Sequence, residues 1–265
     1  MRIPFFKFQG AGNDFIIIDN RLDFLPLLSQ ETIEKWCNRR FGVGADGLML
    51  LNKHEVVDFK MVYYNSDGAE STLCGNGARC IAALASLLNN HKNKFRFEAI
   101  DGMHDAQILD FDQIDAWQVS VAMHDVNFIA LHRNDWVLNT GSPHYVRLVN
   151  QVETFDVKSE GEKVRNSEAF KQQGINVNFL EKLDVNSIFI RTYERGVEDE
   201  TLSCGTGVTA AALVFAQDKT DGNHKIQVKT KGGLLQVNML KQGDIFTEIQ
   251  LIGPATLVFI GVLEL

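Results

Sequence analysis

The sequence has no excess of basic residues and no long apolar run. Its 26 lysine and arginine residues are outnumbered by 34 aspartate and glutamate residues, so the formal net charge is −8. Domains that bind nucleic acids are usually basic, because they neutralise phosphates. A helix that crosses a membrane needs about 18 consecutive apolar residues, and no stretch of these 265 residues approaches that length. We therefore expect neither a nucleic-acid partner nor a membrane partner.

Signals for export and for zinc binding are also missing. Pro4, Gly10 and Asn13 interrupt any apolar segment near the amino terminus, so we expect no signal peptide and a cytoplasmic protein. Thiols stay reduced in that compartment, which predicts that the four cysteines form no structural disulfides. No pair of cysteines or histidines has the spacing of a zinc site, and we expect no metal.

What the sequence does contain is a motif that occurs twice. Residues 70–84 read ESTLCGNGARCIAAL, and residues 200–213 read ETLSCGTGVTAAAL. Each copy has a glutamate four positions before a cysteine, then Cys-Gly-x-Gly and a run of small and apolar residues. The cysteines are Cys74 and Cys204, and 204 − 74 = 130 is close to half of 265.

Two further pairs of loops repeat at nearly the same offset. GAGNDF pairs with TGSPH, because Asn13 and Ser142 are 142 − 13 = 129 residues apart. FGVGADG pairs with QGINVNF, because Gly42 and Gly174 are 174 − 42 = 132 residues apart. A period this long indicates a twofold duplication, since solenoid repeats recur every 20 to 50 residues.

The hydrophobic pattern predicts a mixed α+β fold of two pseudo-symmetric halves. Residues 75–88 and 205–216 are apolar nearly all round, which is typical of a buried helix. Each half is expected to be a mostly antiparallel sheet or barrel wrapped around its apolar helix. The first half covers residues 1–123 with Cys74 and the second covers residues 124–254 with Cys204, while residues 255–265 return to the first half as a strand.

The remaining elements follow from alternation and from capping residues. A helix is predicted over residues 29–40 with Ser29 as its N-cap, and another over residues 154–172, where Gly161 weakens the helical pattern. Residues 226–239 are expected to form a hairpin over Gly232 and Gly233. Further strands are predicted at residues 3–8, 15–19, 48–51, 57–63, 95–99, 117–123, 136–138, 145–149 and 188–193.

The position of each repeated cysteine at a helix start suggests acid–base chemistry. The first N–H groups of a helix have no internal partner and carry partial positive charge, which favours a thiolate. Gly-x-Gly lets these groups approach a carboxylate closely. Two such helix starts bound to one carboxylate would spread the charge that develops when the adjacent carbon loses its proton. A thiolate on one face and a thiol on the other would then invert that carbon.

Other cysteines and glycines have simpler interpretations. Cys37 lies on the apolar stripe of its helix, and Cys80 lies roughly 240° around the helix from Cys74, so we expect both to be structural. Residues 42–47 match G-x-G-x-x-G, but they follow a helix and precede a strand. The dinucleotide fingerprint requires the reverse order, so no such cofactor is expected.

In chain order, the motifs GAGNDF, GADG, NSDGAESTLCGNGARC, GSPH, NVNF, YERG and ETLSCGTG resemble the diaminopimelate epimerase family. The resemblance covers nearly the whole chain. It implies a homodimeric, cofactor-independent enzyme that interconverts L,L- and meso-diaminopimelate for lysine and peptidoglycan-precursor synthesis. It also implies two similar halves with the site between them.

The resemblance assigns roles residue by residue. It implies that Cys74 and Cys204 are the proton donor and acceptor, and that His144 and Glu194 support them and orient the reacting amino group. The reacting carboxylate is implied to bind at Gly75, Asn76, Gly205 and Thr206. The distal end of the substrate is implied to bind at Asn13, Asn65, Asn176 and Arg195, with Glu194 also among the substrate-binding residues.

The chain departs from the family pattern at three places. Ser142 stands where the family usually has asparagine, Gly47 stands where glutamine is frequent, and residues 197–199 lengthen the loop before Cys204 by one residue. These departures predict an altered fit at the distal end of the substrate.

Three alternatives remain open at this point. A proline-type racemase would use the same two thiols, but its substrate has no distal amino-acid end for Arg195 to bind. A thiol redox protein would join Cys74 and Cys204 in a switchable disulfide. A binding scaffold would explain neither cysteine.

Overall fold

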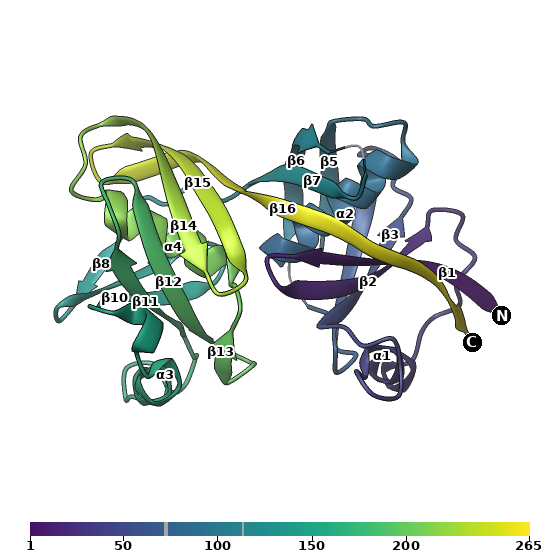
Figure 1. Ribbon diagram of the computed structural model, residues 1–265, viewed down its shortest axis with the longest axis horizontal. Coiled ribbons are helices and arrows are strands. Elements are labelled where there is room, and N and C mark those ends of the chain that lie inside the picture. The colour runs from purple at the N-terminus through teal and green to yellow at the C-terminus, as the bar shows by residue number, and fades with distance from the viewer. Residues whose placement is uncertain (72–73, 113) are drawn as a thin grey trace. The chain divides into compact units, whose positions relative to one another are not determined.

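The computed structural model in Figure 1 describes residues 1–71, 74–112 and 114–265. Its internal contacts divide the chain into two units, residues 1–121 with 253–265, and residues 122–252. The boundaries expected from the sequence, after residues 123 and 254, differ from these by 123 − 121 = 2 and 254 − 252 = 2 residues. Thr72 and Leu73, in the first copy of the repeated motif, lie outside the described residues.

The first unit is a sheet that closes on itself around helix α2 (Gly75–Leu88). Its strands are β1 (Arg2–Gly10), β2 (Asn13–Asn20), β3 (Gly47–Asn52), β4 (Phe59–Asn65), β5 (Lys94–Ala99), β6 (Gly102–Phe111), β7 (Ala116–Ala122) and the second part of β16 (Ile245–Glu264). They pair in this order, and β16 also pairs with β1, which closes the ring. Helix α2 contacts β1, β2, β3 and β6 from inside (Figure 1).

Helix α2 forms because nearly all its side chains can be buried at once. Every residue from Gly75 to Ser86 is buried, and the helix packs among phenylalanines such as Phe8, Phe15 and Phe59. The bounds expected from the apolar pattern, residues 75–88, are confirmed. Helix α1 (Gln30–Cys37) covers the outer face of the first strands, and the Ser29 side chain caps it by accepting from the Thr32 N–H.

In the second unit a sheet lies around helix α4 (Gly205–Ala216). Its strands are β8 (Ala130–His132), β9 (Asp135–Asn139), β10 (Pro143–Leu148), β11 (Asn176–Lys182), β12 (Ser187–Glu194), β13 (Asp199–Thr201), β14 (Gly222–Thr230), β15 (Gly233–Gln242) and the first part of β16. A 3₁₀ turn, η1 (Val152–Thr154), and helix α3 (Val157–Arg165) lie between β10 and β11. Helix α4 matches the predicted residues 205–216.

The two units share one sequence of strand pairings. In the first, β2 and β3 are parallel across α1, β3 and β4 are antiparallel, and β4 and β5 are parallel across α2. In the second, β10 and β11 are parallel across α3, β11 and β12 are antiparallel, and β12 and β14 are parallel across α4. The predicted α+β class, with two similar halves each built around an apolar helix, is confirmed.

Several predicted bounds are wrong. The helix expected over residues 154–172 is only α3, because the Asp156 side chain caps its start and the Ser167 hydroxyl bonds the Val164 carbonyl just past its end. Residues 199–201, expected in a loop, form β13 against β12. The sequence did not predict strand β8. The NVNF motif, residues 176–179, forms part of strand β11, which was also not predicted. Strand β16 begins at Ile245, ten residues before the predicted 255, because it pairs first with β15 and then with β7 and β1.

Within the described ranges, no helix combines the length and the apolar character needed to cross a membrane.

Gly161 in α3 provides a test of this packing. A β-carbon there would lie 2.4 Å from the Tyr193 β-carbon in β12. In an isolated helix, alanine is more favourable than glycine by about 1 kcal/mol. We nevertheless expect Gly161→Ala to lower the free energy of unfolding by about 1–3 kcal/mol, because α3 and β12 must move apart to accommodate the added methyl group. Urea unfolding measures this. Glu162→Ala, a substitution at the exposed neighbouring residue, is the control. Equal changes in the free energy of unfolding for Gly161→Ala and Glu162→Ala would contradict the close packing of α3 on β12.

Candidate active site

The first candidate thiol stands at the start of α2. Cys74 has extended backbone angles (φ −96°, ψ 120°) and is half-buried, and the helix begins at Gly75. A β-carbon at Gly77 would lie 3.1 Å from the Met49 sulfur in β3. The second glycine of the motif therefore lets the first turn of the helix lie against the sheet. The first N–H groups of a helix have no partner within the helix, so this turn is the expected place for an anion.

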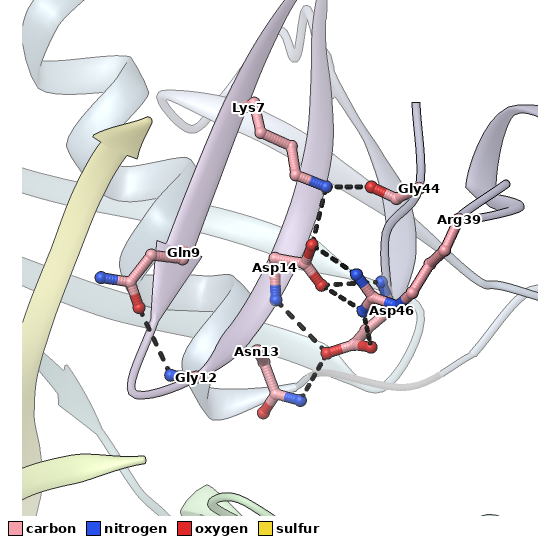
Figure 2. Close-up of polar contacts among 8 residues, drawn as sticks. All are labelled: Lys7, Gln9, Gly12, Asn13, Asp14, Arg39, Gly44 and Asp46. Carbon is pink, nitrogen blue, oxygen red and sulfur yellow. Dashed lines mark hydrogen bonds and ion pairs between the residues drawn. The ribbon is translucent and has the colours of Figure 1, made fainter. Parts of the chain in front are cut away.

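Asn76 is held from both sides by side chains. Its Nδ2 donates to Oδ1 of Asn13, and its Oδ1 accepts a 2.8 Å hydrogen bond from Nη2 of Arg79. Asn13 in turn donates through Nδ2 to Asp46 at 2.9 Å (Figure 2). The structure thus brings together two predicted residues, Asn13 and Asn76, and adds Arg79, which the sequence argument missed although it lies inside the quoted motif.

A cluster of ion pairs fixes the loop that carries Asn13. Arg39 contacts Asp14 at 2.6 Å and Asp46 at 2.7 Å, while Lys7 contacts Asp14 at 2.8 Å (Figure 2). Burial alone would raise the pKa of Asp14, but hydrogen bonds from Arg39 and Lys7 outweigh it and hold that pKa below its ordinary value. The cluster ties the GAGND turn to the GADG loop, which explains why both motifs carry an aspartate.

The second candidate thiol stands at the start of α4. Cys204 has extended backbone angles (φ −115°, ψ 111°) and is buried. Its Sγ lies 3.5 Å from the hydroxyl of Thr206. A β-carbon at Gly207 would lie 2.4 Å from Oδ1 of Asn178 in β11. The second glycine of this motif therefore has the same packing role as Gly77.

His144 reaches this thiol through Thr206. Its Nε2 lies 2.8 Å from the Thr206 hydroxyl, and its Nδ1 lies 3.1 Å from Nδ2 of Asn178. Oδ1 of Asn178 accepts from Thr192, so its Nδ2 must be the donor to His144. The network therefore assigns the proton of the imidazole to Nε2, which donates to Thr206. The Thr206 hydroxyl is left free to donate to Cys204.

The imidazole of His144 is neutral at physiological pH. Burial lowers its pKa to about 3, and the nearby charge of Arg195 acts in the same direction. A neutral imidazole with this pKa orients Thr206 and does not supply or remove protons itself. Sequence reasoning missed Asn178, which fixes the ring. The spacing of Asn176 and Asn178 in a strand, which puts both on one face, is the signal that could have found it.

Two residues expected at the distal end of the substrate, Asn176 and Arg195, meet Ser142 in the second unit. Nδ2 of Asn176 donates to Ser142 at 2.9 Å, and Oδ1 of Asn176 accepts from the Arg195 N–H at 2.9 Å. The guanidinium of Arg195 is exposed and reaches Ser142 at 3.5 Å. Glu194, the preceding residue, accepts from the Thr201 hydroxyl at 2.8 Å. Nη1 of Arg195 also donates to the Gln173 carbonyl at 3.1 Å. The cluster therefore holds an exposed guanidinium beside amide and hydroxyl groups, which suits a carboxylate.

Known proteins share both the sequence pattern and the fold. A sequence profile described as diaminopimelate epimerase matches residues 5–129 and 136–258. The chain belongs to the diaminopimelate epimerase family. A relative from Flavobacterium psychrophilum with that name is 51% identical over 255 residues, which cover 96% of this chain and 97% of the relative. The protein is accordingly an isomerase of the epimerase type.

Solved structures of lower sequence identity show the same fold. A PhzF-family phenazine biosynthesis protein from Bacillus anthracis has a TM-score of 0.74 at 16% identity and covers 100% of both chains. A hydroxyproline epimerase from Agrobacterium vitis, with trans-4-hydroxy-L-proline bound, has a TM-score of 0.71 at 11% identity and covers 99% of this chain and 91% of its own.

The structure gives a physical reason for one departure from the diaminopimelate epimerase pattern. A β-carbon at Gly47 would lie 2.5 Å from the ring of Tyr63 and 2.4 Å from the Tyr64 carbonyl. The Tyr63 ring therefore fills the space that a longer side chain at position 47 requires. Asn65, another predicted distal contact, is half-buried at the end of β4 and pairs with Gly47 across the sheet.

The longer loop before Cys204 is attached to helix α3. Arg165 contacts Glu198 at 3.3 Å, and Lys158 contacts Asp199 at 2.7 Å. Glu198 has a positive φ of 56° and its backbone N–H bonds the Glu194 carbonyl, so the extra residue is taken up by a tight turn. The departure therefore changes the surface beside Arg195.

The other two cysteines lie in the core, as the sequence predicted. Burial raises the pKa of Cys37 to about 11 and that of Cys80 to about 12, so both remain thiols. None of the four cysteines forms a disulfide in the structure. Among residues 1–71, 74–112 and 114–265, no group of three or more His, Cys, Asp or Glu side chains is arranged to hold a metal ion.

The neutral state of His144 predicts a stability change with pH. An unfolded histidine takes up a proton near pH 6.5, whereas His144 in the folded protein does so only near pH 3. The unfolded state thus binds more protons between these values, and stability falls as the pH drops below about 6.5, by at most about 1.4 kcal/mol per unit from this group. We expect His144→Gln to show a smaller loss between pH 7 and pH 5 in urea unfolding. Identical pH slopes for the two proteins would contradict a neutral His144.

Proposed function

We propose that this protein interconverts L,L- and meso-diaminopimelate by moving one proton at the α-carbon, without a cofactor. The observation that carries the proposal is the pair of thiols, Cys74 and Cys204, each placed at the start of a buried helix by a duplicated motif. Membership of the diaminopimelate epimerase family supports the substrate. The reaction belongs to lysine and peptidoglycan-precursor synthesis. We place it in the cytoplasm, where thiols stay reduced.

In the proposed mechanism the two thiols act on opposite faces of one carbon. A thiolate removes the α-proton and becomes a thiol, while the electron pair of the broken C–H bond is delocalised into the α-carboxylate. The opposite thiol then donates its proton to the other face and becomes a thiolate, so atoms and charge balance. The N–H groups at Gly75 and Asn76, and at Gly205 and Thr206, stabilise the carboxylate charge.

The surrounding side chains hold the substrate and the thiols in place. His144 orients Thr206, whose hydroxyl faces Cys204. Arg195 and Asn176, with Ser142, bind the distal carboxylate through a charge-assisted contact and neutral donors, and Asn65 and Asn13 add polar groups. Glu194 accepts from the ammonium group of the substrate. Asn13 has a second role. Its side-chain amide is hydrogen-bonded to Asn76, so it also supports the part of the site that binds the reacting carboxylate.

The decisive experiment follows deuterium exchange. In deuterated buffer without added cofactor, we expect the wild-type protein to convert L,L-diaminopimelate to the meso form with incorporation of deuterium at one α-carbon. Cys74→Ala and Cys204→Ala should each lower kcat for epimerisation by about 10²- to 10⁴-fold, since each removes an acid–base group. Mass spectrometry and chiral separation measure both quantities.

The controls are Cys37→Ala and proline as an alternative substrate. Cys37 is a buried thiol outside the candidate site, so its variant should keep the wild-type rate if it folds. Full epimerisation by either Cys74→Ala or Cys204→Ala would rule out the two-thiol mechanism. Inversion of proline with no reaction of diaminopimelate would replace the proposed substrate with that of a proline-type racemase.

We also propose that the protein is a homodimer in which β16 forms the contact. Val258, Ile260 and Val262 on this strand are 54%, 59% and 48% exposed. Ile260 and Val262 pair with Phe6 and Pro4 of β1, and Val258 lies at the bulge in that pairing. Adjacent exposed apolar side chains of this kind are typical of a protein interface.

Sedimentation velocity tests the dimer. We expect a dimer for the wild type and a shift toward monomer for Ile260→Lys, because a charge would be buried at the contact. Val185→Lys is the matched control, since Val185 is 77% exposed in a loop of the second unit. A monomeric wild type, or an unchanged dimer in Ile260→Lys, would contradict the proposed contact.

A further inference from the structure

Helix α2 contains a fully buried guanidinium. Arg79 has no exposed surface. Its Nη2 donates to Oδ1 of Asn76 at 2.8 Å, its Nη1 to the Gly75 carbonyl at 3.3 Å, and its Nε to the Pro254 carbonyl at 3.2 Å. These acceptors are all neutral, and the described part of the chain gives Arg79 no carboxylate partner. A buried cation without an anion is costly, so its presence requires an explanation.

The charges that act on Arg79 come from thiols. Burial lowers the pKa of Arg79, and negative charge on Cys80 and Cys74 opposes that effect. Cys80 remains protonated because burial raises its pKa to about 12. Cys74 is therefore the group that can supply the negative charge, and the attraction between a Cys74 thiolate and Arg79 favours both charged forms.

The guanidinium has almost no freedom to move. A β-carbon at Gly10 in β1 would lie 3.4 Å from Nη2 of Arg79 and 3.1 Å from the Cys80 sulfur, so the glycine makes room for both side chains. Asn76 is fixed on its other side by Asn13, which the Asp46 carboxylate holds. Arg79 thus lies in a rigid, closed site directly behind the first turn of α2.

We infer that Arg79 is a positioning residue for the first thiol: its guanidinium holds the Gly75–Asn76 turn in place and keeps a permanent positive charge beside Cys74. The inference rests on the proposed function for its catalytic meaning. It assigns different resting states to the two thiols, with Cys74 as the thiolate and Cys204 as the thiol in the free protein.

The second half has a neutral residue at the equivalent position of its helix. Thr209 stands at the position equivalent to Arg79, since 209 − 204 = 5 and 79 − 74 = 5. Its hydroxyl bonds the Gly205 carbonyl at 3.1 Å, as Arg79 bonds that of Gly75. Thr206, equivalent to Asn76, is oriented by the neutral His144. Both helix starts are thus braced in the same way, but the brace at the first is a cation and the brace at the second is a neutral hydroxyl. The Arg195 charge that acts on His144 belongs to an exposed side chain.

The test measures the pH dependence of alkylation at each thiol. The protein is treated with iodoacetamide between pH 5 and pH 10, and the rate at each cysteine is followed by mass spectrometry of its peptide. The midpoint of each profile reports the thiolate fraction independently of access to the thiol. We expect the Cys74 midpoint in the wild type to lie about one pH unit or more below that of Cys204.

Variants separate the charge of Arg79 from its hydrogen bonds. We expect Arg79→Met to raise the Cys74 midpoint by about one unit or more and to leave the Cys204 midpoint unchanged. Arg79→Lys should restore most of the low midpoint while kcat stays below wild type, because the hydrogen bonds to Gly75 and Asn76 are lost. Thr209→Val, the matched control, should leave the Cys74 midpoint unchanged.

Three results would overturn the inference. They are a wild-type Cys74 midpoint that is not below that of Cys204, an Arg79→Met midpoint equal to wild type, and an Arg79→Lys midpoint as high as that of Arg79→Met. The first of these results is measured on the wild type. The inference can therefore be overturned even if the Arg79 variants fail to fold. Alkylation requires no diaminopimelate, so a wild-type protein with the expected profiles but no epimerisation would count against the proposed function alone.

Discussion

The burial of a helix start is the constraint on which both halves depend. The first N–H groups of a helix have no partner in the helix, and leaving such groups unpaired away from water costs about 1–3 kcal/mol each. Gly75 and Gly205 begin α2 and α4 and both are buried. An anion bound at these positions would accept hydrogen bonds from such groups, so the proposed site for the carboxylate lies where each buried helix begins.

The features that could be predicted from the sequence are those that local pattern determines. The bounds of α2 and α4 were predictable, because a helix buried on all sides must be apolar on all sides. The N-cap of α1 was predictable, because Ser29 acts on the N–H of a residue three positions away. The duplicated cysteines needed only a comparison of the two halves.

What could not be predicted depends on contacts between distant segments. The sequence marks Asn178 and Arg79 as polar residues in otherwise apolar surroundings, but only tertiary packing shows that one fixes the His144 ring and the other lies behind Asn76. The length of β16 depends on partners in β15, β7 and β1, which are remote in sequence. Likewise Gly47 was noted as unusual, and only the position of the Tyr63 ring explains it.

Strand β16 has a consequence for how the chain is made. Residues 245–252 of this strand belong to the second unit, while residues 253–264 complete the first by pairing with β7 and β1. A ribosome synthesises β1 long before the strand that closes its ring. The first unit therefore keeps an open, hydrogen-bonding edge while the whole second unit is being made, and such edges invite pairing with other chains. In the cell, the first half to be synthesised is the one that must wait longest to complete its fold.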